Sequence, residues 1–316
     1  MAKYSFKNKH VLITGATGGL GFALAQRLAG MGAHLIVSSR SMAALTELVE
    51  SLPGKTRAIP ITADLSAKGE AEILANKAIK TLNHIDVLFN NAGIGYFALM
   101  EETKEESIRH LFEVNTFSPI TLIKTLVPHM KAQKSGRIIN IVSTAGRIPI
   151  PTVAVYGGSK SALAVMANTM RLELEPSNID IINIYPGTVE TSFEENALRE
   201  EERPGLCPVD HCGKPKFKIA NQVMKAAQGQ SGEVWLERPE KWLSLAAIAW
   251  PNYVDARLKN FRNKVIKNFF TYPYNFLVFN LSYFYPSFSK NLNNCLASKV
   301  RIICTINNSL DTRPTY

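Results

Sequence analysis

Tyr156 and Lys160 are the residues of this sequence whose types and spacing most directly allow proton transfer. They stand four positions apart in the segment TVAVYGGSKSALAVMANTMRLELEP, whose composition is typical of a helix. Residues four apart on a helix lie on one face. A phenol with a pKa of about 10 is a poor base at neutral pH, and an ammonium group one turn away stabilises its phenolate. This spacing is expected by chance in a chain of this composition, so other motifs must support the assignment.

Two adjacent glycines, Gly157 and Gly158, follow the tyrosine directly. A glycine inside a helix costs about 1 kcal/mol relative to alanine. We therefore expect both glycines to let the helix lie close to its neighbours while Tyr156 and Lys160 project together into a site.

A glycine-rich turn near the start of the chain is suited to binding a dinucleotide. Gly15, Gly19 and Gly21 in TGATGGLG lie between an apolar strand and a helix whose first N–H groups could face a pyrophosphate. Such glycines can also form a tight turn that binds nothing. Ser39 and Arg40 stand where an enzyme that prefers NAD carries an acidic residue, and the guanidinium favours NADP. The alternative is a surface arginine that opens a helix.

Apolar runs of strand type alternate with helical patterns along most of the chain. The runs are HVLIT, HLIVSS, TRAIPIT, IDVLFNNAG, GRIINIVS, IDIINIYPG and GEVWLE. Near-continuous apolar strands are typical of a parallel sheet with helices on both faces. We predict an α/β fold with a doubly wound, mostly parallel seven-stranded sheet in one domain over 1–254. One long helix is expected over 103–131. Each motif lies at the carboxyl end of a strand or in the helix after it, where such sheets bind ligands.

Five ordered motifs resemble the short-chain dehydrogenase/reductase family: TGATGGLG, NNAG from Asn90 to Gly93, the serine of IVSTAG, YGGSK and YPGTVET. The resemblance spans roughly residues 6–250 and implies a Rossmann fold that transfers a hydride between a nicotinamide and a carbonyl/alcohol pair. It specifies a type of reaction and leaves the substrate open.

The resemblance implies four catalytic residues. Tyr156 would be the general acid/base, Lys160 would lower the pKa of Tyr156, and Ser143 would orient the substrate carbonyl. Asn115 would hold a water of a proton relay. The alternatives are that Ser143 only ends a strand and that Asn115 only bonds backbone in the long helix.

The resemblance also implies a set of contacts with NADP, with NAD as the less favoured cofactor. Asp64 is expected near the adenine, where it could equally cap the next helix. No second basic residue lies in the glycine turn, where Ala16 and Thr17 stand, so NADP rests on Arg40. The expected cofactor-binding residues are Gly15, Thr17, Gly19, Leu20, Gly21, Ser39, Arg40, Asp64, Leu65, Asn91, Ala92, Gly93, Tyr156, Lys160, Pro186, Gly187, Val189 and Thr191.

Residues 192–218 are expected to form a lid over the substrate, acidic and helical at first and then rich in Pro, Gly and Cys. Apolar side chains in two other segments expected near the substrate, GIGYFALM and GRIPIPTVAV, suggest a pocket for a hydrophobic carbonyl compound or alcohol. They are Tyr96, Phe97, Ile148, Ile150, Val153 and Val155. The cysteines Cys207 and Cys212 with His211 between them lack a second ligand pair, so we predict free thiols and no metal.

The net charge of +10 comes mostly from a C-terminal extension over 255–316, which carries nine basic and two acidic residues. The body is nearly balanced, so no nucleic-acid partner is predicted. The uncharged, aromatic-rich stretch 268–289 leaves three alternatives, an interfacial membrane anchor, a packed element or a poorly ordered tail. The start of the chain lacks a secretory signal, which predicts a cytoplasmic protein with membrane association as the alternative.

The leading hypothesis is an NADP(H)-dependent oxidoreductase that acts on a small-molecule carbonyl or alcohol. A catalytically silent NADP-binding regulatory or scaffold protein is the alternative from another class, and an epimerase or dehydratase is a further one. Such a silent protein is expected to lose Tyr156, Lys160 or Ser143, and all are present. The resemblance also implies a homodimer or homotetramer built on the long helices that begin near Thr103 and Val153.

Overall fold

The structure is a computed structural model that describes residues 3–54, 57–200, 213–256 and 259. The chain divides into two compact units, Met1–Leu277 and Val278–Tyr316, and every described residue belongs to the first. Two features expected from the sequence lie outside the described residues. They are the cysteine-containing part of the lid and nearly all of the basic C-terminal extension.

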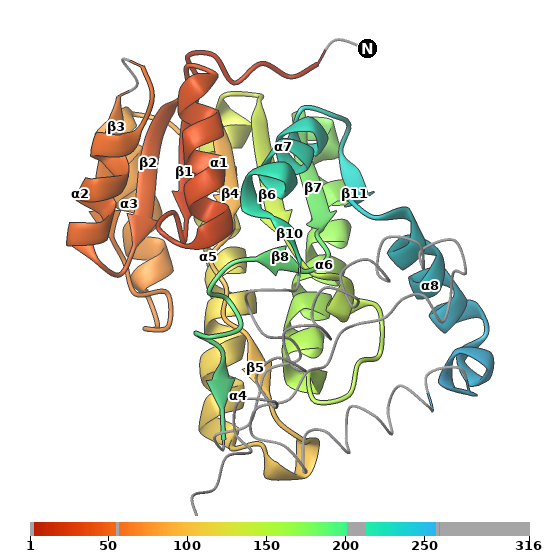
Figure 1. Ribbon diagram of the computed structural model, residues 1–316. Helices are drawn as coiled ribbons and strands as arrows, with labels where there is room; N and C mark the ends of the chain where they lie inside the picture. Colours follow the sequence, from red (N-terminus) through yellow and green to blue (C-terminus); the bar gives the residue numbers. More distant parts are fainter. Residues whose placement is uncertain (1–2, 55–56, 201–212, 257–258, 260–316) are drawn as a thin grey trace, which may run out of the picture. The chain divides into compact units, whose positions relative to one another are not determined.

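Seven parallel strands form the central sheet in the order β11-β7-β6-β4-β1-β2-β3, which confirms the predicted α/β fold (Figure 1). The residues of the inner strands are mostly buried because helices cover both faces, whereas those of the edge strands β3 and β11 are mostly half-buried. The strands are β1 (His10–Thr14), β2 (His34–Ser39), β3 (Ala58–Thr62), β4 (Val87–Asn90), β6 (Gly136–Ile141), β7 (Ile179–Tyr185) and β11 (Gly232–Trp235).

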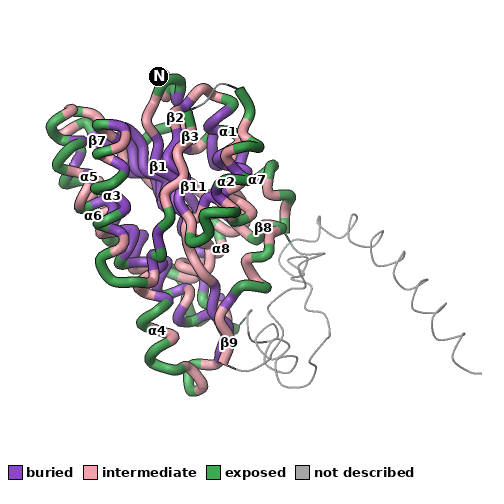
Figure 2. The backbone as a smooth tube through the Cα atoms, turned by 90° about the vertical axis from the view of Figure 1, so that its left-hand side faces the viewer, coloured by how far each residue is buried: buried purple, intermediate pink, exposed green. Residues whose placement is uncertain are grey.

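Three helices pack on each face of this sheet, and Figure 2 shows the buried residues along the strands and the helix faces turned toward them. Each helix turns a stripe of Leu, Ile, Val and Ala to the sheet, and burying one such large side chain stabilises the fold by roughly 1.5–3 kcal/mol. One face holds α1 (Gly19–Gly30), α2 (Met42–Ser51) and α7 (Lys216–Ala227). The other holds α3 (Glu70–Leu82), α5 (Ser118–Ala132) and α6 (Ala154–Leu174).

The strand order reverses at β1, which pairs with β2 on one side and with β4 on the other. At this boundary the carboxyl ends of β1 and β4 lie side by side, with Ile13 opposite Phe89. Ligands of doubly wound sheets bind at such a point. The glycine-rich turn and the NNAG segment therefore meet at one edge of the sheet.

The single helix predicted over 103–131 is wrong. The structure has α4 (Glu105–Phe112), a π-helical turn η2 (Glu113–Phe117) and then α5. The wider turn carries Asn115, whose side chain bonds the backbone of Ile94 in another loop. These side-chain bonds to a distant backbone favour the local departure from α-helical geometry, as π-bulges often do near functional sites.

The helical start predicted for the lid is also wrong. Residues 192–197 form turns, and β9 (Leu198–Arg199) pairs with β5 (Tyr96–Phe97) in a small sheet that the sequence did not predict. A second small sheet joins β8 (Val189–Glu190) to β10 (Lys214–Pro215). The other short elements are η1 (Met100–Glu102), η3 (Thr144–Gly146), η4 (Glu175–Ser177) and the helix α8 (Arg238–Ala249).

Among the described residues, no helix has both the length and the apolar character needed to cross a bilayer.

The two glycines of α6 differ in their surroundings. A Cβ on Gly157 would lie 2.5 Å from the carbonyl oxygen of Ala145 in η3, so only glycine allows this approach. A Cβ on Gly158 would meet no atom within 4 Å. The expectation of close packing is therefore correct for Gly157 and wrong for Gly158, because Gly158 faces open space.

Replacing Gly157 by Ala should destabilise the protein by about 1–3 kcal/mol, because the new methyl group must push the η3 backbone away. Replacing Gly158 by Ala should instead stabilise it by about 0.5–1 kcal/mol through helix propensity. Urea unfolding of the two variants beside the unmodified chain measures both changes. Equal shifts for the matched pair would contradict the packing argument.

Candidate active site

The glycine turn after β1 lies directly against the loop after β4. Gly15 has a φ of +62°, and a Cβ there would lie 2.8 Å from the Cα of Ala92. The Nδ2 of Asn91 donates to the carbonyl oxygens of Thr14 (2.9 Å) and Gly15 (3.1 Å). The predicted residues Gly15, Asn91 and Ala92 are therefore brought together, and any side chain at position 15 would separate them. Gly21 shares this contact, since its Cβ would overlap the carbonyl of Gly15.

The N-terminus of α1 has the properties of an anion site. Its N-cap residue is Gly18, so no capping side chain bonds the first N–H groups of the helix. The first turn contains no acidic residue that would repel an anion. The side chain of Thr191 lies against Gly19, where a Cβ would overlap it. Glycine backbone and helix N–H groups without a side-chain cap fit a pyrophosphate group.

Arg40 lies exposed just beyond β2 and acts on Asp64 electrostatically. Hydrogen bonds from Ser66 to the Asp64 carboxylate, through N (3.1 Å) and Oγ (2.7 Å), lower the pKa of Asp64 most, and the charge of Arg40 lowers it further. Asp64 therefore fixes its own turn and does not cap α3, which begins at Glu70. Arg40 and Asp64 flank the same edge of the sheet as the glycine turn.

The segment after β7 carries Pro186, Gly187, Val189 and Thr191, which the sequence analysis assigned to the cofactor, and Pro186 is buried. Its position depends on a residue that the sequence did not single out. A Cβ on Gly187 would lie 2.6 Å from Oε1 of Glu240 in α8. Burial raises the pKa of the Glu240 carboxyl to about 7, and the charge of Glu237 raises it too.

Tyr156 and Ser143 face each other from α6 and η3. Burial raises the pKa of Tyr156 to about 12, and a hydrogen bond with Ser143 lowers it in part. Ser143 follows β6 and caps η3, since its Oγ accepts from the N–H of Ala145 at 3.2 Å. Ser143 therefore both begins a turn and reaches the tyrosine.

Lys160 is 4% exposed, and its Nζ donates to the carbonyl oxygen of Ile141 at 3.1 Å. Burial lowers the pKa of Lys160 to about 8. Burial is the largest influence on the pKa of Tyr156 and raises it, so the expected lowering by Lys160 stays a prediction.

Asn115 is fully buried and joins three parts of the site. Its Oδ1 accepts from the N–H of Ile94 (2.9 Å), and its Nδ2 donates to the carbonyl of Ile94 (2.9 Å) and to Oγ of Ser159 (3.1 Å). A Cβ on Gly93 would lie 3.0 Å from Nζ of Lys160 and 3.2 Å from Oδ1 of Asn115. Gly93 is thus the point where the lysine and the asparagine converge.

The described part of the lid covers Tyr156. The ring of Phe193 lies 5.8 Å from that of Tyr156, centroid to centroid, and packs on Gly95. Glu200 holds the segment in place. Its carboxylate accepts a hydrogen bond from Tyr96 OH (2.5 Å) and forms an ion pair with Lys104 (2.9 Å). Hydrogen bonds from Ser107, Tyr96 and Lys104 lower the pKa of Glu200 to about 2. The sequence marked the lid but gave no sign of which aromatic and acidic side chains would reach the site.

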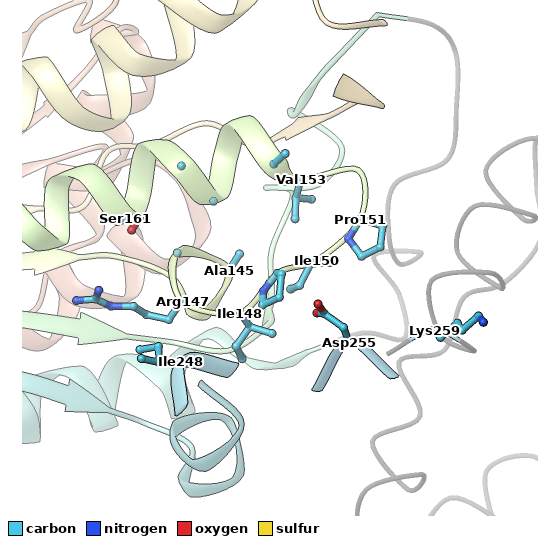
Figure 3. Close-up of a pocket in the computed structure, with 15 residues that line it drawn as sticks. Ala145, Arg147, Ile148, Ile150, Pro151, Val153, Ser161, Ile248, Asp255 and Lys259 are labelled. Carbon is cyan, nitrogen blue, oxygen red and sulfur yellow. The ribbon is translucent and has the colours of Figure 1, made fainter. Parts of the chain in front are cut away.

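A cavity of about 750 Å³ lies between η3, the start of α6 and α8 (Figure 3). Of the six residues expected to form an apolar pocket, Ile148, Ile150 and Val153 line it. The other three are packed in hydrophobic clusters and do not line it. The residues Ser143, Tyr156 and Lys160 are all described, and none of them lines this cavity. It is therefore a space beside the catalytic helix and not the space above the tyrosine.

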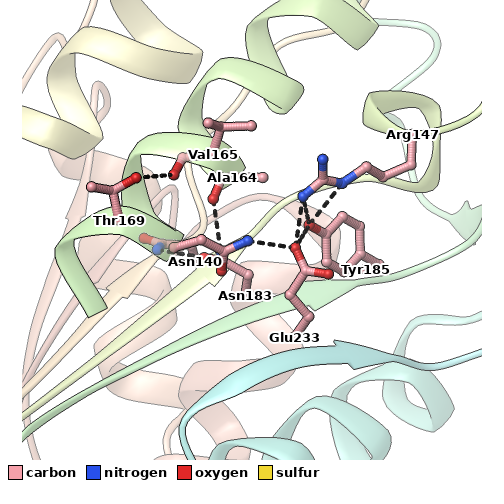
Figure 4. Close-up of polar contacts among 9 residues, drawn as sticks. Asn140, Arg147, Ala164, Val165, Thr169, Asn183, Tyr185 and Glu233 are labelled. Atoms are coloured by element: carbon pink, nitrogen blue, oxygen red, sulfur yellow. Dashed lines mark hydrogen bonds and ion pairs between the residues drawn. The ribbon is translucent and has the colours of Figure 1, made fainter. Parts of the chain in front are cut away.

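Arg147, four residues after Ser143, ties the η3 turn to the sheet (Figure 4). Its guanidinium donates to Oε1 of Glu233 (2.7 Å) and to Tyr185 OH (3.2 Å). Tyr185 OH also donates to Glu233 (2.7 Å), and its ring stacks on Trp235 with centroids 4.3 Å apart. The turn that carries Ser143 is thus anchored to β7 and β11.

A line of side-chain amides, three of them buried and one half-buried, ends at the same carboxylate. Asn90 donates to Asn140 (2.9 Å), Asn140 to Asn183 (2.9 Å), and Asn183 to Asn168 (3.0 Å). Asn168 then donates to Glu233 at 2.6 Å. Every donor points the same way, so Glu233 connects the NNAG segment to the turn with Ser143.

Comparisons with known proteins agree with this geometry. A family described as short chain dehydrogenase matches residues 9–202. The chain is 35% identical over 242 residues to dehydrogenase/reductase SDR family member 7B of Mus musculus. The aligned region covers 74% of this chain and 75% of the mouse protein.

Solved structures share the fold. A short-chain dehydrogenase from Streptomyces avermitilis has a TM-score of 0.68 at 27% identity, covering 84% of this chain and 99% of that one. One from Burkholderia cenocepacia in complex with NADP has a TM-score of 0.67 at 25% identity, covering 81% and 99%. An NAD⁺-bound xylitol dehydrogenase, at 24% identity and a TM-score of 0.63 over 73% and 98%, matches in fold alone.

Replacing Arg147 by Met should loosen the η3 turn without unfolding the protein. A lost charge-assisted hydrogen bond of about 1.5–3 kcal/mol corresponds to a roughly tenfold or greater loss of local protection. Hydrogen exchange followed by mass spectrometry of the peptide over 143–150 measures it, and Arg147→Lys should restore part of the protection.

The matched control is Arg109→Met, which removes an exposed arginine that pairs with Glu105 on α4. This variant should leave exchange over 143–150 unchanged. Equal protection in the Arg147→Met variant and the unmodified chain would show that the anchor does not hold the turn.

Proposed function

Because the chain belongs to the short-chain dehydrogenase family of oxidoreductases, we propose that it transfers a hydride between NADP(H) and a carbonyl or alcohol substrate. The observation that carries the proposal is the grouping of four side chains at one edge of the sheet, two from α6, one from η2 and one from the residue that caps η3. They are Ser143, Tyr156, Lys160 and Asn115. Scattered structural residues would have no reason to meet there.

Tyr156 acts as the general acid/base in this proposal. With a pKa raised by burial to about 12, its phenol holds a proton at neutral pH and can donate it to a carbonyl oxygen. The hydroxyl of Ser143, which is bonded to the phenol, orients that oxygen. This arrangement suits the reduction of a carbonyl to an alcohol.

Lys160 and Asn115 support the tyrosine from the inner side. With a pKa near 8, Lys160 is mostly charged at neutral pH, held by the carbonyl of Ile141. Asn115 fixes the backbone of Ile94 and thereby the shape of the loop that contains Gly93. In our proposal Asn115 holds a water through which Lys160 relays protons to and from the phenol.

When bound, NADPH supplies the hydride, and the chain supplies a cradle for it. The glycine turn, the α1 N-terminus and Thr191 fit the pyrophosphate, and Arg40 favours the 2′-phosphate over a free hydroxyl. The NADP complex of the Burkholderia relative supports this choice, while the NAD⁺-bound xylitol dehydrogenase shows that the fold also accepts NAD. The remaining contacts proposed are Thr17, Leu20, Ser39, Asp64, Leu65, Asn91, Ala92, Gly93, Pro186, Gly187 and Val189.

The surface that covers Tyr156 favours a hydrophobic substrate. Phe193 lies against the tyrosine ring, so a molecule that reaches the phenol meets an aromatic wall. We place the catalytic domain at 1–254 and the lid at 192–218. Exposed Val165, Met166 and Leu172 on α6 support a homodimer or homotetramer that buries this helix.

Replacing Tyr156 by Phe should lower the turnover number at least about 10²-fold, since it removes only the proton that the reaction needs. The assay follows NADPH oxidation with a panel of ketones and aldehydes, and NADPH binding followed by fluorescence should stay unchanged. Tyr253→Phe, at a tyrosine 59% exposed, is the matched control with full activity.

Full activity of the Tyr156→Phe variant would refute the catalytic assignment. An unmodified chain that binds NADPH but reduces nothing in the panel would point to the silent binding protein. Turnover of small polar sugars alone would refute the hydrophobic substrate.

Replacing Arg40 by Asp should reduce the preference for NADPH over NADH at least roughly tenfold, because a carboxylate repels the 2′-phosphate and accepts from ribose hydroxyls. The ratio of kcat/KM for the two cofactors measures this preference. Arg109→Asp on α4 makes the same charge change as a control. An unchanged ratio in the Arg40 variant would remove the basis of the NADP assignment.

A further inference from the structure

Three of the six histidines of the chain lie at the edge of the central sheet opposite the cofactor turn. His10 begins β1, His34 begins β2, and His84 lies just before β4. These are the amino ends of parallel strands, whereas the proposed cofactor site lies at the carboxyl ends. The cluster is therefore separate from the oxidoreductase site, and none of its members has a role there.

His10, His84 and Asp86 each offer one ligand atom, and these atoms lie within 4.8 Å of one another. Nε2 of His84 is 3.5 Å from Oδ2 of Asp86, and the rings of His10 and His84 have centroids 4.3 Å apart. Bonds of about 2.0–2.2 Å to a tetrahedral zinc ion place ligand atoms roughly 3.4 Å apart. The three groups thus need only small side-chain rotations to close on one ion.

Hydrogen bonds already orient these groups for a metal. Nδ1 of His10 lies 3.2 Å from the carbonyl oxygen of His84, so a proton on Nδ1 leaves the lone pair of Nε2 free. Metal-binding histidines are typically fixed by such a bond through their other nitrogen. The carboxylate of Asp86, which is 11% exposed, is held by the N–H of His10 (2.8 Å) and by Nζ of Lys9 (3.0 Å).

We propose that His10, His84 and Asp86 bind a divalent transition-metal ion, with Zn²⁺ the best match, and that the ion fastens β1 to the segment before β4. Two imidazoles and one carboxylate are ligands that Zn²⁺ accepts readily. Water fills the fourth position. Nδ1 of His34 is buried without a hydrogen-bond partner among the described residues, and the rings of His34 and His10 are 5.6 Å apart, so His34 is placed to bond that water.

The charge of Lys9 opposes cation binding. The direction in which the metal affinity changes when this charge is removed therefore tests the proposal. Lys9 pairs with Oδ1 of Asp86, and its side chain is 35% exposed, so it can turn into solvent when an ion binds. Removing this charge should tighten metal binding. A site formed by unrelated surface groups would not respond to it.

The test is Zn²⁺ binding by the full untagged chain, measured by competition with a chromophoric chelator and by metal analysis after desalting. We expect one ion per chain, and a roughly tenfold or greater loss of affinity in His84→Ala, whose side chain is 42% exposed. Lys9→Gln should bind more tightly. Zn²⁺ should raise the Tm of the unmodified chain and leave that of His84→Ala unchanged.

Two control variants locate the ion. His129→Ala removes an exposed histidine of α5 and should bind as the unmodified chain does. A double variant, Cys207→Ser with Cys212→Ser, removes the closely spaced cysteines of the sequence and should also bind normally. Failure of the unmodified chain to bind Zn²⁺, equal affinity in His84→Ala, or loss of binding only in the cysteine variant would each overturn the proposal.

Discussion

The close approach of two backbone segments, with no side chain between them, is the constraint on which the candidate site depends. The turn at Gly15 lies against Ala92, and Asn91 bonds the carbonyls on the β1 side of this contact. A methyl group at this contact would force the loops apart, because close-packed interiors have few voids to absorb it. The same contact sets the position of Gly93, and through it the places of Lys160 and Asn115.

The site buries Lys160 and partly buries Tyr156, and burial moves their pKa values in opposite directions. The pKa of Tyr156 rises and that of Lys160 falls, so each group is driven toward its neutral form. The carbonyl of Ile141 and the hydroxyl of Ser143 offset part of this desolvation. The presence of Tyr156 and Lys160 on one helix face therefore does not by itself fix their protonation states, because their surroundings also set the two pKa values.

The sequence predicted those features whose signals are local. Seven apolar runs gave the seven strands, and ordered motifs identified Ser143, Tyr156 and Lys160, which the fold brings together. It missed features that depend on distant partners. The π-helical turn arises from bonds between Asn115 and Ile94, and Arg147 meets Glu233 across 86 positions. The periodicity of a sequence does not indicate which distant residues will be in contact. The predicted helix at the start of the lid is wrong for the same reason, because Leu198 pairs there with the distant Tyr96.

The line of amides from Asn90 to Glu233 has a direction, and this has an evolutionary consequence. Asn140, Asn183 and Asn168 each accept from one neighbour in the line and donate to the next, whereas Asn90 only donates. A leucine at position 140 or 183 would remove two of these hydrogen bonds, and the loss of a buried partner is costly. Four residues spread over three strands and one helix are thus linked in one hydrogen-bonded line. In related chains we expect these four residues to be kept together or replaced together, although they lie far apart in the sequence.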